Sequence, residues 1–182
     1  MNESLLLVVR AAAFSAAQHC RAVEVSKRFR KGVEPTPYIN HPLEVARVLI
    51  EEGGVDDPVV LAAALLHDTM EDVPTPYAVL LKEFGPEVAN IVLELTDDKA
   101  LPKAERKRLQ MVNAPHKTHK AAMVKIADKI CNLRDIANDP PANWDLTKKQ
   151  AYYDWARQVV GSLPKCNSAL EAAFERCLTV KL

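Results

Sequence analysis

Hydrophobic residues recur every three or four positions along most of the chain, which is the spacing that gives a helix one buried face. Near the N-terminus, for example, Leu6, Val9, Ala13 and Ala17 share one face of an expected helix over residues 3–20. No segment shows the strict alternation of a half-buried β-strand. The pattern therefore predicts an all-α fold, a helical bundle of roughly 8–10 helices.

Prolines, glycines and capping residues mark where the other expected helices begin and end. The expected ranges are 40–50, 58–72, 76–84, 86–95, 102–112, 120–138, 146–163 and 169–178. Between them, segment 23–37 is expected to be a loop or a short hairpin, and segment 113–119 a loop. With 182 residues and no internal repeat, the chain is predicted to form one domain over residues 1–182.

The composition is that of a globular protein, with 48% hydrophobic residues. No apolar run is long enough to span a membrane, and the short run from Leu5 to Val9 lacks the preceding basic stretch of a signal peptide. A cytoplasmic location is therefore expected. The four cysteines are scattered without a Cys-x-x-Cys pair, which argues against a zinc knuckle or a disulfide framework.

Charges are segregated along the middle of the chain, although the net charge is zero. Residues 51–98 carry 12 acidic side chains and one basic side chain, whereas residues 99–135 carry 10 basic and 3 acidic side chains. An acidic segment that could hold a cation, followed by a basic one that could hold phosphates, favours a small polyanionic substrate over nucleic acid or a membrane. Alternatively, both segments are solvated helix faces that offset one another.

The most informative stretch runs from Val59 to Asp72, where eight apolar residues lead directly into His67, Asp68, Glu71 and Asp72. On one continuous helix, each member of the first pair would lie one turn before a member of the second pair. Burying such groups is costly unless a partner such as a divalent cation compensates. The first pair could hold the cation, and the acidic pair could orient or deprotonate a water molecule. Alternatively, these side chains point into solvent at a helix end.

Two residues in other segments could complete such a site. His41 stands where a helix begins after a constrained turn, immediately before a proline. Asp128 falls beside the apolar face of the helix expected over 120–138, where a buried carboxylate needs a strong partner. A metal held by these two residues together with His67 and Asp68 would be such a partner.

These residues lie in short sequence words that resemble one family of proteins. The words are PYINHP (37–42), ALLHDTMED (64–72), ELTDDK (94–99), LPKAERKRLQ (101–110) and VKIADKICNLRD (124–135). The His and Asp set resembles the HD superfamily of phosphohydrolases. Together, the words resemble the hydrolase domain of the RelA/SpoT alarmone enzymes, and most of all the stand-alone small alarmone hydrolases, including the metazoan SpoT homologues. Residues 20–29 depart from the family run HxxQxRK and form a longer segment.

The resemblance implies an HD-type, metal-dependent phosphohydrolase domain that acts in the stringent response. Its implied reaction is hydrolysis of the 3′-pyrophosphate of guanosine tetra- or pentaphosphate, (p)ppGpp, to pyrophosphate and GDP or GTP. The implied cofactor is Mn²⁺, held by His41, His67, Asp68 and Asp128. Glu71 and Asp72 are implied to be the catalytic residues, which position and activate the attacking water.

The resemblance also implies contacts to the nucleotide substrate. Four basic residues match positions near the phosphates, one amide matches a position that holds the nucleotide, and one tyrosine matches a position near the nucleoside. These residues are Arg30, Lys31, Lys103, Arg106, Asn132 and Tyr152. Judged without the resemblance, Tyr152 is ordinarily a packing residue, and stacking on a base is the alternative.

Other functions remain open on the sequence alone. One is an HD phosphohydrolase acting on another nucleotide, such as the 2′-phosphate of NADPH. A dinuclear HD phosphodiesterase would need further histidine ligands, and the remaining candidates, His116 and His119, lie in an expected loop. The third is a non-catalytic alarmone-binding module, against which the presence of all six proposed metal and water residues argues. No oligomeric state is predicted.

Overall fold

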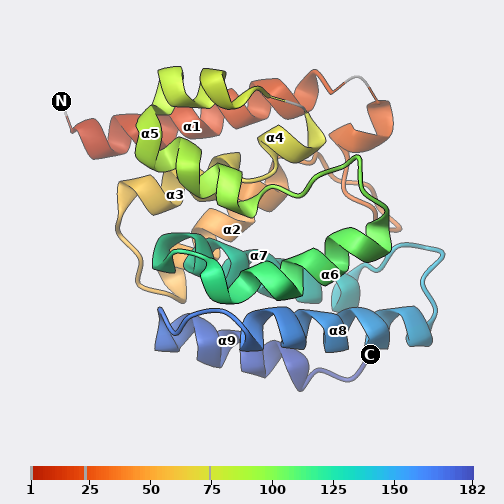
Figure 1. Cartoon of the computed structure of the whole chain (residues 1–182). Coiled ribbons are helices and arrows are strands. Elements are labelled where there is room, and N and C mark those ends of the chain that lie inside the picture. Colours follow the sequence, from red (N-terminus) through yellow and green to blue (C-terminus); the bar gives the residue numbers. More distant parts are fainter. Residues whose placement is uncertain (1, 23, 74) are drawn as a thin grey trace.

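The computed structural model describes residues 2–22, 24–73 and 75–182. Val23 and Pro74, which fall in two of the expected loops, lie outside the described residues. Within the described residues there are nine α-helices, two 3₁₀-helices and no β-strand, so the predicted all-α bundle is confirmed (Figure 1). The helices are α1 (Glu3–Cys20), η1 (Val25–Arg28), α2 (Asn40–Glu51), α3 (Pro58–Leu66), α4 (Thr69–Asp72), α5 (Tyr77–Leu95), α6 (Lys103–Asn113), η2 (Ala114–His116), α7 (His119–Asn138), α8 (Leu146–Gly161) and α9 (Ser168–Leu178).

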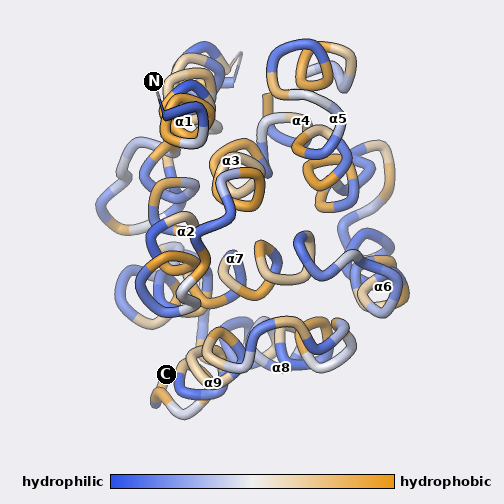
Figure 2. The backbone as a smooth tube through the Cα atoms, turned by 90° about the vertical axis from the view of Figure 1, so that its left-hand side faces the viewer, coloured by the Kyte–Doolittle hydropathy of each residue, from blue (hydrophilic) through white to orange (hydrophobic). Residues whose placement is uncertain are grey.

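Helix α3 lies at the centre of the bundle and packs against α1, α2, α5 and α7 (Figure 2). Its sequence is apolar on every side, and such a helix is stable only when it is surrounded by other elements. Every residue from Val60 to Leu66 is buried. Asp57 begins the helix by accepting a hydrogen bond from the Val59 amide at 2.8 Å, and Pro58 fills the first helical position.

Helix α7 is the second central element, because it contacts α2, α3 and α5 as well as α8 and α9. The last two helices form a layer on the side of α7 away from α3 (Figures 1 and 2). Three polar residues of α7, Lys125, Asp128 and Lys129, are buried along with its apolar residues. Because buried charges are costly, each of these side chains needs a polar or charged partner in the interior.

Two irregular segments agree with the sequence pattern. Gly85 has a φ of 81°, which divides α5 into two helical arms at the residue expected to separate two helices. The segment after η1 forms the short hairpin that was one of two expectations for this region. Phe29 and Pro37 form an antiparallel bridge, and the Arg30 amide donates to the Thr36 carbonyl at 2.8 Å.

The helix expected over 58–72 is wrong in one respect, because it is broken at His67 and Asp68 into α3 and the single turn α4. Two side chains form hydrogen bonds with backbone carbonyl groups near the end of α3. His67 Nδ1 lies 2.7 Å from the Ala64 carbonyl oxygen, and the Thr69 hydroxyl donates to the Leu66 carbonyl at 2.7 Å. Side chains that bond to the preceding turn compete with helix continuation, and both of these bonds lie at the break.

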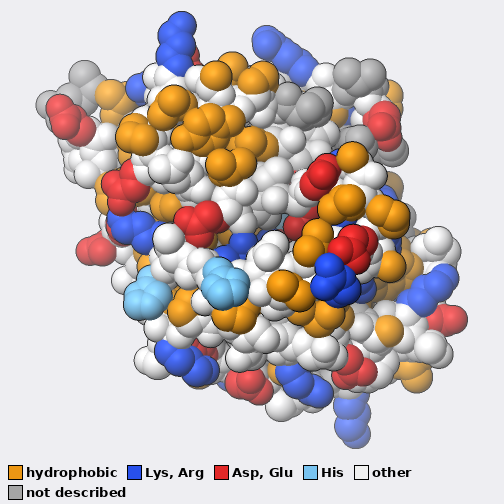
Figure 3. All heavy atoms as spheres, in the orientation of Figure 1, with side chains coloured by type: hydrophobic (Ala, Val, Ile, Leu, Met, Phe, Trp, Pro, Cys, Tyr) orange, Lys and Arg blue, Asp and Glu red, His pale blue; other side chains and the backbone are white. Residues whose placement is uncertain are grey.

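Acidic, basic and hydrophobic side chains are interspersed on the face shown in Figure 3. The fold therefore brings part of the basic segment next to part of the acidic segment, so that their charges offset one another. Lys120 of the basic segment, for example, lies 2.8 Å from Asp57 and 2.5 Å from Glu87 of the acidic segment. Among the described helices, none combines the length and the apolar character needed to cross a membrane.

Candidate functional site

His67 lies at the break between α3 and α4 with its side chain buried. Its Nδ1 lies 2.7 Å from the Ala64 carbonyl, which can only accept a hydrogen bond, so the proton of the neutral ring is placed on Nδ1. Its Nε2 is buried and forms no hydrogen bond of good geometry with the described residues, although Asp68 Oδ2 lies 3.1 Å away. When the ring is neutral, Nε2 is therefore the unprotonated nitrogen, directed at the interior as a metal ligand requires.

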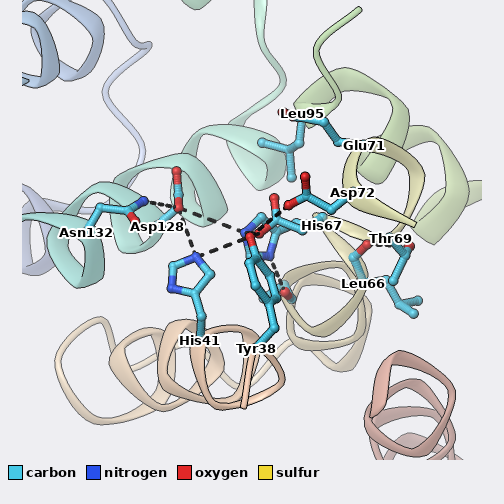
Figure 4. Close-up of polar contacts among 12 residues, drawn as sticks. Tyr38, His41, Leu66, His67, Thr69, Glu71, Asp72, Leu95, Asp128 and Asn132 are labelled. Carbon is cyan, nitrogen blue, oxygen red and sulfur yellow. Dashed lines mark hydrogen bonds and ion pairs between the residues drawn. The ribbon is translucent and has the colours of Figure 1, made fainter. Parts of the chain in front are cut away.

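The side chains of His41, on α2, and Asp128, on α7, lie close to His67 Nε2, because α2 and α7 pack against each other. His41 Nε2 lies 3.2 Å from Asp128 Oδ1, and the His41 and His67 ring centroids are 5.3 Å apart. One ligand atom from each of His41, His67 and Asp128 lies within 4.8 Å of the others. Figure 4 shows the three side chains directed toward one point.

Asp68 adds a second carboxylate to this group. Its Oδ2 lies 3.1 Å from His67 Nε2 and 3.9 Å from His41 Nε2. Bonds of about 2.1 Å from one divalent ion to nitrogen and oxygen ligands place neighbouring ligand atoms about 3 to 4 Å apart. The donor set and its spacing therefore fit a divalent metal.

Without a metal, the charges of the group are balanced by protons and by a buried ammonium group. Burial disfavours the charged ring of His67, but the adjacent Asp68 carboxylate outweighs burial and raises the pKa of His67 to about 9. Burial lowers the pKa of His41 below its ordinary value, and Arg30 lowers it further. Burial opposes ionisation of Asp128, yet Lys129 and the contact with His41 hold the pKa of that carboxyl well below its usual range.

Lys129 is a buried cation beside this group that sequence analysis did not single out. Its Nζ lies 3.1 Å from Asp128 Oδ2 and 4.6 Å from the centroid of the Trp155 ring. The Trp155 indole donates to the Lys107 carbonyl at 3.1 Å, which connects this contact to α6. The ammonium group thus occupies one oxygen of Asp128 and leaves the other facing the imidazoles.

Tyr38 is a second contact residue that sequence analysis did not single out, although it lies within the PYINHP word. Its hydroxyl lies 2.7 Å from Asp68 Oδ2 and 2.9 Å from Asp72 Oδ2, in reach of both carboxylates (Figure 4). Since a hydroxyl has one proton, it donates to only one of them at a time. The Tyr38 ring stacks on the buried His19 ring, with centroids 4.6 Å apart.

Glu71 and Asp72 lie on α4, at the edge of the group, and both are paired with Lys99. The Lys99 ammonium lies 2.8 Å from Glu71 Oε1 and 3.0 Å from Asp72 Oδ1. Arg106 Nη1 lies 3.7 Å from Glu71 Oε1. Burial raises the pKa of Glu71 above its ordinary value, and the neighbouring Asp68 raises it further, while Lys99 opposes both.

Asn132 connects the metal-fitting group to the predicted phosphate contacts. Its Nδ2 donates to Asp128 Oδ1 at 2.5 Å, and its Oδ1 accepts from Arg30 Nη2 at 2.8 Å. Arg30 also donates to Asp135 at 2.6 Å, so its guanidinium group is held at a fixed position. Figure 4 shows Asn132 next to Asp128 on α7.

A cleft of about 370 Å³ opens beside Asp72. Four of the predicted substrate contacts line it, namely Arg30, Lys31, Asn132 and Tyr152. Lys99 and Trp144 also line it, although sequence analysis did not select either residue. The other two predicted contacts do not line it: Lys103 is exposed at the start of α6, and Arg106 is directed toward Glu71.

The chain belongs to the HD domain family, whose model matches residues 11–156. It is similar over nearly its whole length to particular HD proteins. Guanosine-3′,5′-bis(diphosphate) 3′-pyrophosphohydrolase MESH1 of Xenopus tropicalis is 49% identical over 175 residues, which cover 96% of this chain and 94% of the relative. MESH1 of Homo sapiens is 46% identical over 175 residues, with the same coverage of 96% and 94%.

A solved structure agrees with this assignment. It is described as a metazoan ortholog of SpoT that hydrolyzes ppGpp and plays a role in starvation responses. It matches with a TM-score of 0.87 and 37% identity over 94% of this chain and 93% of that chain. The resemblance to RelA/SpoT-type HD hydrolases, and to the stand-alone metazoan group in particular, is therefore confirmed.

Proposed function

We propose that this protein is a 3′-pyrophosphohydrolase that converts guanosine 3′,5′-bis(diphosphate) to GDP and pyrophosphate, and the corresponding pentaphosphate to GTP. The observation that carries this proposal is the similarity to relatives named for this activity. They are 46% and 49% identical to the chain, and the match covers 94% of their own length. The metal-fitting group and the cleft lie within the matched part of the chain.

The proposed cofactor is Mn²⁺, held by His41, His67, Asp68 and Asp128. Mn²⁺ accepts both imidazole nitrogen and carboxylate oxygen, which matches this donor set. When bound, the metal supplies Lewis-acid chemistry: it lowers the pKa of water and offsets charge on phosphate oxygens. The position of the buried Nε2 of His67 supports the assignment, because it faces the carboxylates of two other proposed ligands, Asp68 at 3.1 Å and Asp128 at 3.9 Å.

The proposed catalytic residues are Glu71 and Asp72, whose carboxylates take the proton of the attacking water. In the proposed step the water oxygen bonds to the phosphorus next to the ribose, the bond from that phosphorus to O3′ breaks, and O3′ takes up a proton to become the 3′-hydroxyl of the nucleotide product. Tyr38 holds the Asp72 carboxylate through a hydrogen bond of 2.9 Å. Burial raises the pKa of Glu71, which makes it a better proton acceptor than an exposed glutamate.

The proposed substrate contacts divide between the two ends of the nucleotide. Cationic side chains of Arg30, Lys31, Lys103 and Arg106 offset phosphate charge, including the charge that develops on the phosphoryl oxygens and on O3′ as the bond between phosphorus and O3′ breaks. Asn132 holds the nucleotide and Tyr152 lies against the nucleoside. Lys99 joins the cations in this proposal, because it lines the cleft and already contacts both catalytic carboxylates.

The proposal is tested by the variants His67→Ala and Asp128→Ala. Each is expected to abolish Mn²⁺-dependent release of pyrophosphate from guanosine 3′,5′-bis(diphosphate) while the helix content measured by circular dichroism is kept. The matched control is His116→Ala, since His116 is exposed on η2 and should leave the activity unchanged. Unchanged turnover in either metal-centre variant would reject the proposal.

A substrate panel separates this function from the alternatives. Guanosine tetraphosphate and pentaphosphate are expected to be hydrolysed, and NADPH tests the phosphohydrolase that acts on another nucleotide. Binding of the guanosine nucleotide without turnover at saturating Mn²⁺ would instead favour a non-catalytic binding module. Two bound metal ions per chain would favour a dinuclear centre, for which the exposed His116 and His119 provide no buried ligand.

A further inference from the structure

A second cavity adjoins the metal-fitting group at His41. It is a crevice of about 190 Å³ lined by His41 and by the polar side chains of Thr36, Asn40, Glu44 and Asp135. Arg30 and Asp135 line both this crevice and the larger cleft, so their ion pair at 2.6 Å lies between the two. The crevice is roomy and polar enough to hold ordered water, which needs two to four polar partners.

The two ring nitrogens of His41 have different surroundings. Nε2 lies 3.2 Å from Asp128 Oδ1, within the metal-fitting group. Nδ1 is buried and has no hydrogen-bond partner among the described residues. In Figure 4 this nitrogen lies on the edge of the ring that faces away from Asp128. If Nε2 binds a metal, the neutral ring carries its proton on Nδ1, and that buried donor requires an acceptor.

His67 provides an internal comparison, because its Nδ1 already has the Ala64 carbonyl as an acceptor at 2.7 Å. Metal-bound histidines nearly always donate their other N–H to a carbonyl, a carboxylate or a water molecule. The protein supplies this acceptor directly for His67. For His41, the crevice is the place where the acceptor can lie.

Glu44 is the side chain best placed to hold that acceptor. It is on α2, three residues after His41, and therefore on the same side of the helix. The exposed Arg47 donates hydrogen bonds of 2.9 Å and 2.5 Å to its carboxylate, which retains further lone pairs for another donor. Asp135, the other carboxylate of the crevice, lies on α7 and pairs with Arg30, so Glu44 is distinguished by its place on the helix that carries His41.

We propose that the crevice is a water-binding site in which one ordered water accepts the His41 Nδ1 proton and donates to the Glu44 carboxylate. Glu44 is then a positioning residue, which acts on the metal through the water and His41. This inference rests on the proposed role of His41 as a metal ligand. Removing such an outer partner typically weakens metal affinity about 10- to 100-fold.

The test measures Mn²⁺ affinity of the full chain by competition with a chelator, in the absence of nucleotide. Glu44→Leu removes the acceptor and is expected to weaken Mn²⁺ binding about tenfold or more. Glu44→Gln keeps an accepting oxygen and should stay within a few-fold of the wild type. Arg47→Ala is the matched control, because it breaks the surface ion pair of Glu44 without changing a residue that lines the crevice. Thermal unfolding of each variant checks that the fold is intact.

A second measurement observes the proposed hydrogen bond itself. In protein loaded with diamagnetic Zn²⁺, the His41 Nδ1 proton is expected to give a slowly exchanging ¹H–¹⁵N signal in the wild type and in Arg47→Ala. The signal should be lost to fast exchange in Glu44→Leu.

Wild-type affinity in Glu44→Leu would overturn the inference, as would equal losses in Glu44→Leu and in either Glu44→Gln or Arg47→Ala. Failure of the proposed function is distinguishable from these results. Mn²⁺ binding that Glu44→Leu weakens, without turnover of any guanosine nucleotide, would reject the hydrolase and support the water site. Absence of Mn²⁺ binding by the wild type would overturn both.

Discussion

Metal binding should release one proton from the protein at neutral pH, because the metal and a proton compete for His67. The contact of 3.1 Å between His67 Nε2 and Asp68 Oδ2 raises the pKa of the imidazole to about 9 in the metal-free protein. The ring is therefore charged at neutral pH and must lose its Nε2 proton before it can coordinate a metal. Above pH 9 the ring is already neutral, so this competition disappears.

The other three proposed ligands do not contribute to the number of protons released on metal binding. The pKa of His41 is lowered by burial, so at neutral pH that ring is neutral. Burial opposes ionisation of Asp68 and Asp128, but His67 and Lys129 respectively outweigh it and hold both pKa values low. Only His67 exchanges a proton for the metal, and the apparent affinity should rise about tenfold per pH unit below pH 9. Between pH 7 and pH 9 the change is about 50-fold, because the ring is still half protonated when the pH equals its pKa.

The assay is isothermal titration calorimetry with Mn²⁺ at pH 7.5 (chosen to lie about 1.5 units below the pKa) in buffers that differ in ionisation enthalpy. The slope of the observed enthalpy against the buffer enthalpy gives the number of protons released, and the expected value is close to one. Chelator competition at several pH values should give the matching dependence of log affinity on pH. His116→Gln is the control, because that exposed histidine should leave the count unchanged.

A count near zero at pH 7.5 would refute the reasoning, since it would mean that His67 is neutral without the metal. A count near two would show that a second ligand is also protonated. In that case the electrostatic assignment of either His41 or a carboxylate would be wrong.

Four substitutions test other parts of the structure. Tyr38→Phe removes the hydroxyl shared by two carboxylates and should lower kcat about 10-fold or more with little change in KM for the nucleotide. Lys99→Met removes the cation that lowers the pKa of Glu71, so the acidic limb of the kcat/KM profile should move to higher pH, and KM should rise. Gly53→Ala should destabilise the protein by about 1–3 kcal/mol in urea unfolding, because its Cβ would lie 2.7 Å from a backbone oxygen and 2.9 Å from a leucine side chain. Gly161→Ala is the opposite case, with no atom within 4 Å of the added Cβ in a helix, and should stabilise the protein by about 0.5–1 kcal/mol in the same measurement.

The helices could be predicted from the sequence because most of them are amphipathic and bounded by recognisable residues. Asp57, Thr118, Asp145 and Asn167 each cap a helix by accepting a hydrogen bond from the backbone of its first turn. The break at His67 could not be predicted in the same way. The local spacing around it is helical, and the side-chain bonds to carbonyls that accompany the break are seen only in the folded chain.

The candidate site was partly predictable for a related reason. His41, His67 and Asp128 are polar residues at positions where the pattern demands burial, and such residues are visible in a sequence. Tyr38 and Lys129 were missed because a tyrosine in a turn or a lysine on a helix is ordinarily a packing or surface residue. The contacts of Tyr38 with Asp68 and Asp72, and of Lys129 with Trp155, join residues far apart in the chain, and spacing along the sequence does not encode them.

The charges around Asp128 explain how one set of buried groups is compatible both with folding and with metal binding. Without metal, the His67 proton offsets Asp68, and the Lys129 ammonium, 3.1 Å from Asp128 Oδ2, offsets Asp128. Neither carboxylate is then an uncompensated buried charge, which would cost several kcal/mol. If the proposed metal binds, the His67 proton is expected to leave, whereas Lys129 would stay on the oxygen of Asp128 that does not face the imidazoles. The His67 proton is thus the positive charge that a metal would replace, whereas the Lys129 ammonium is a positive charge that stays in place.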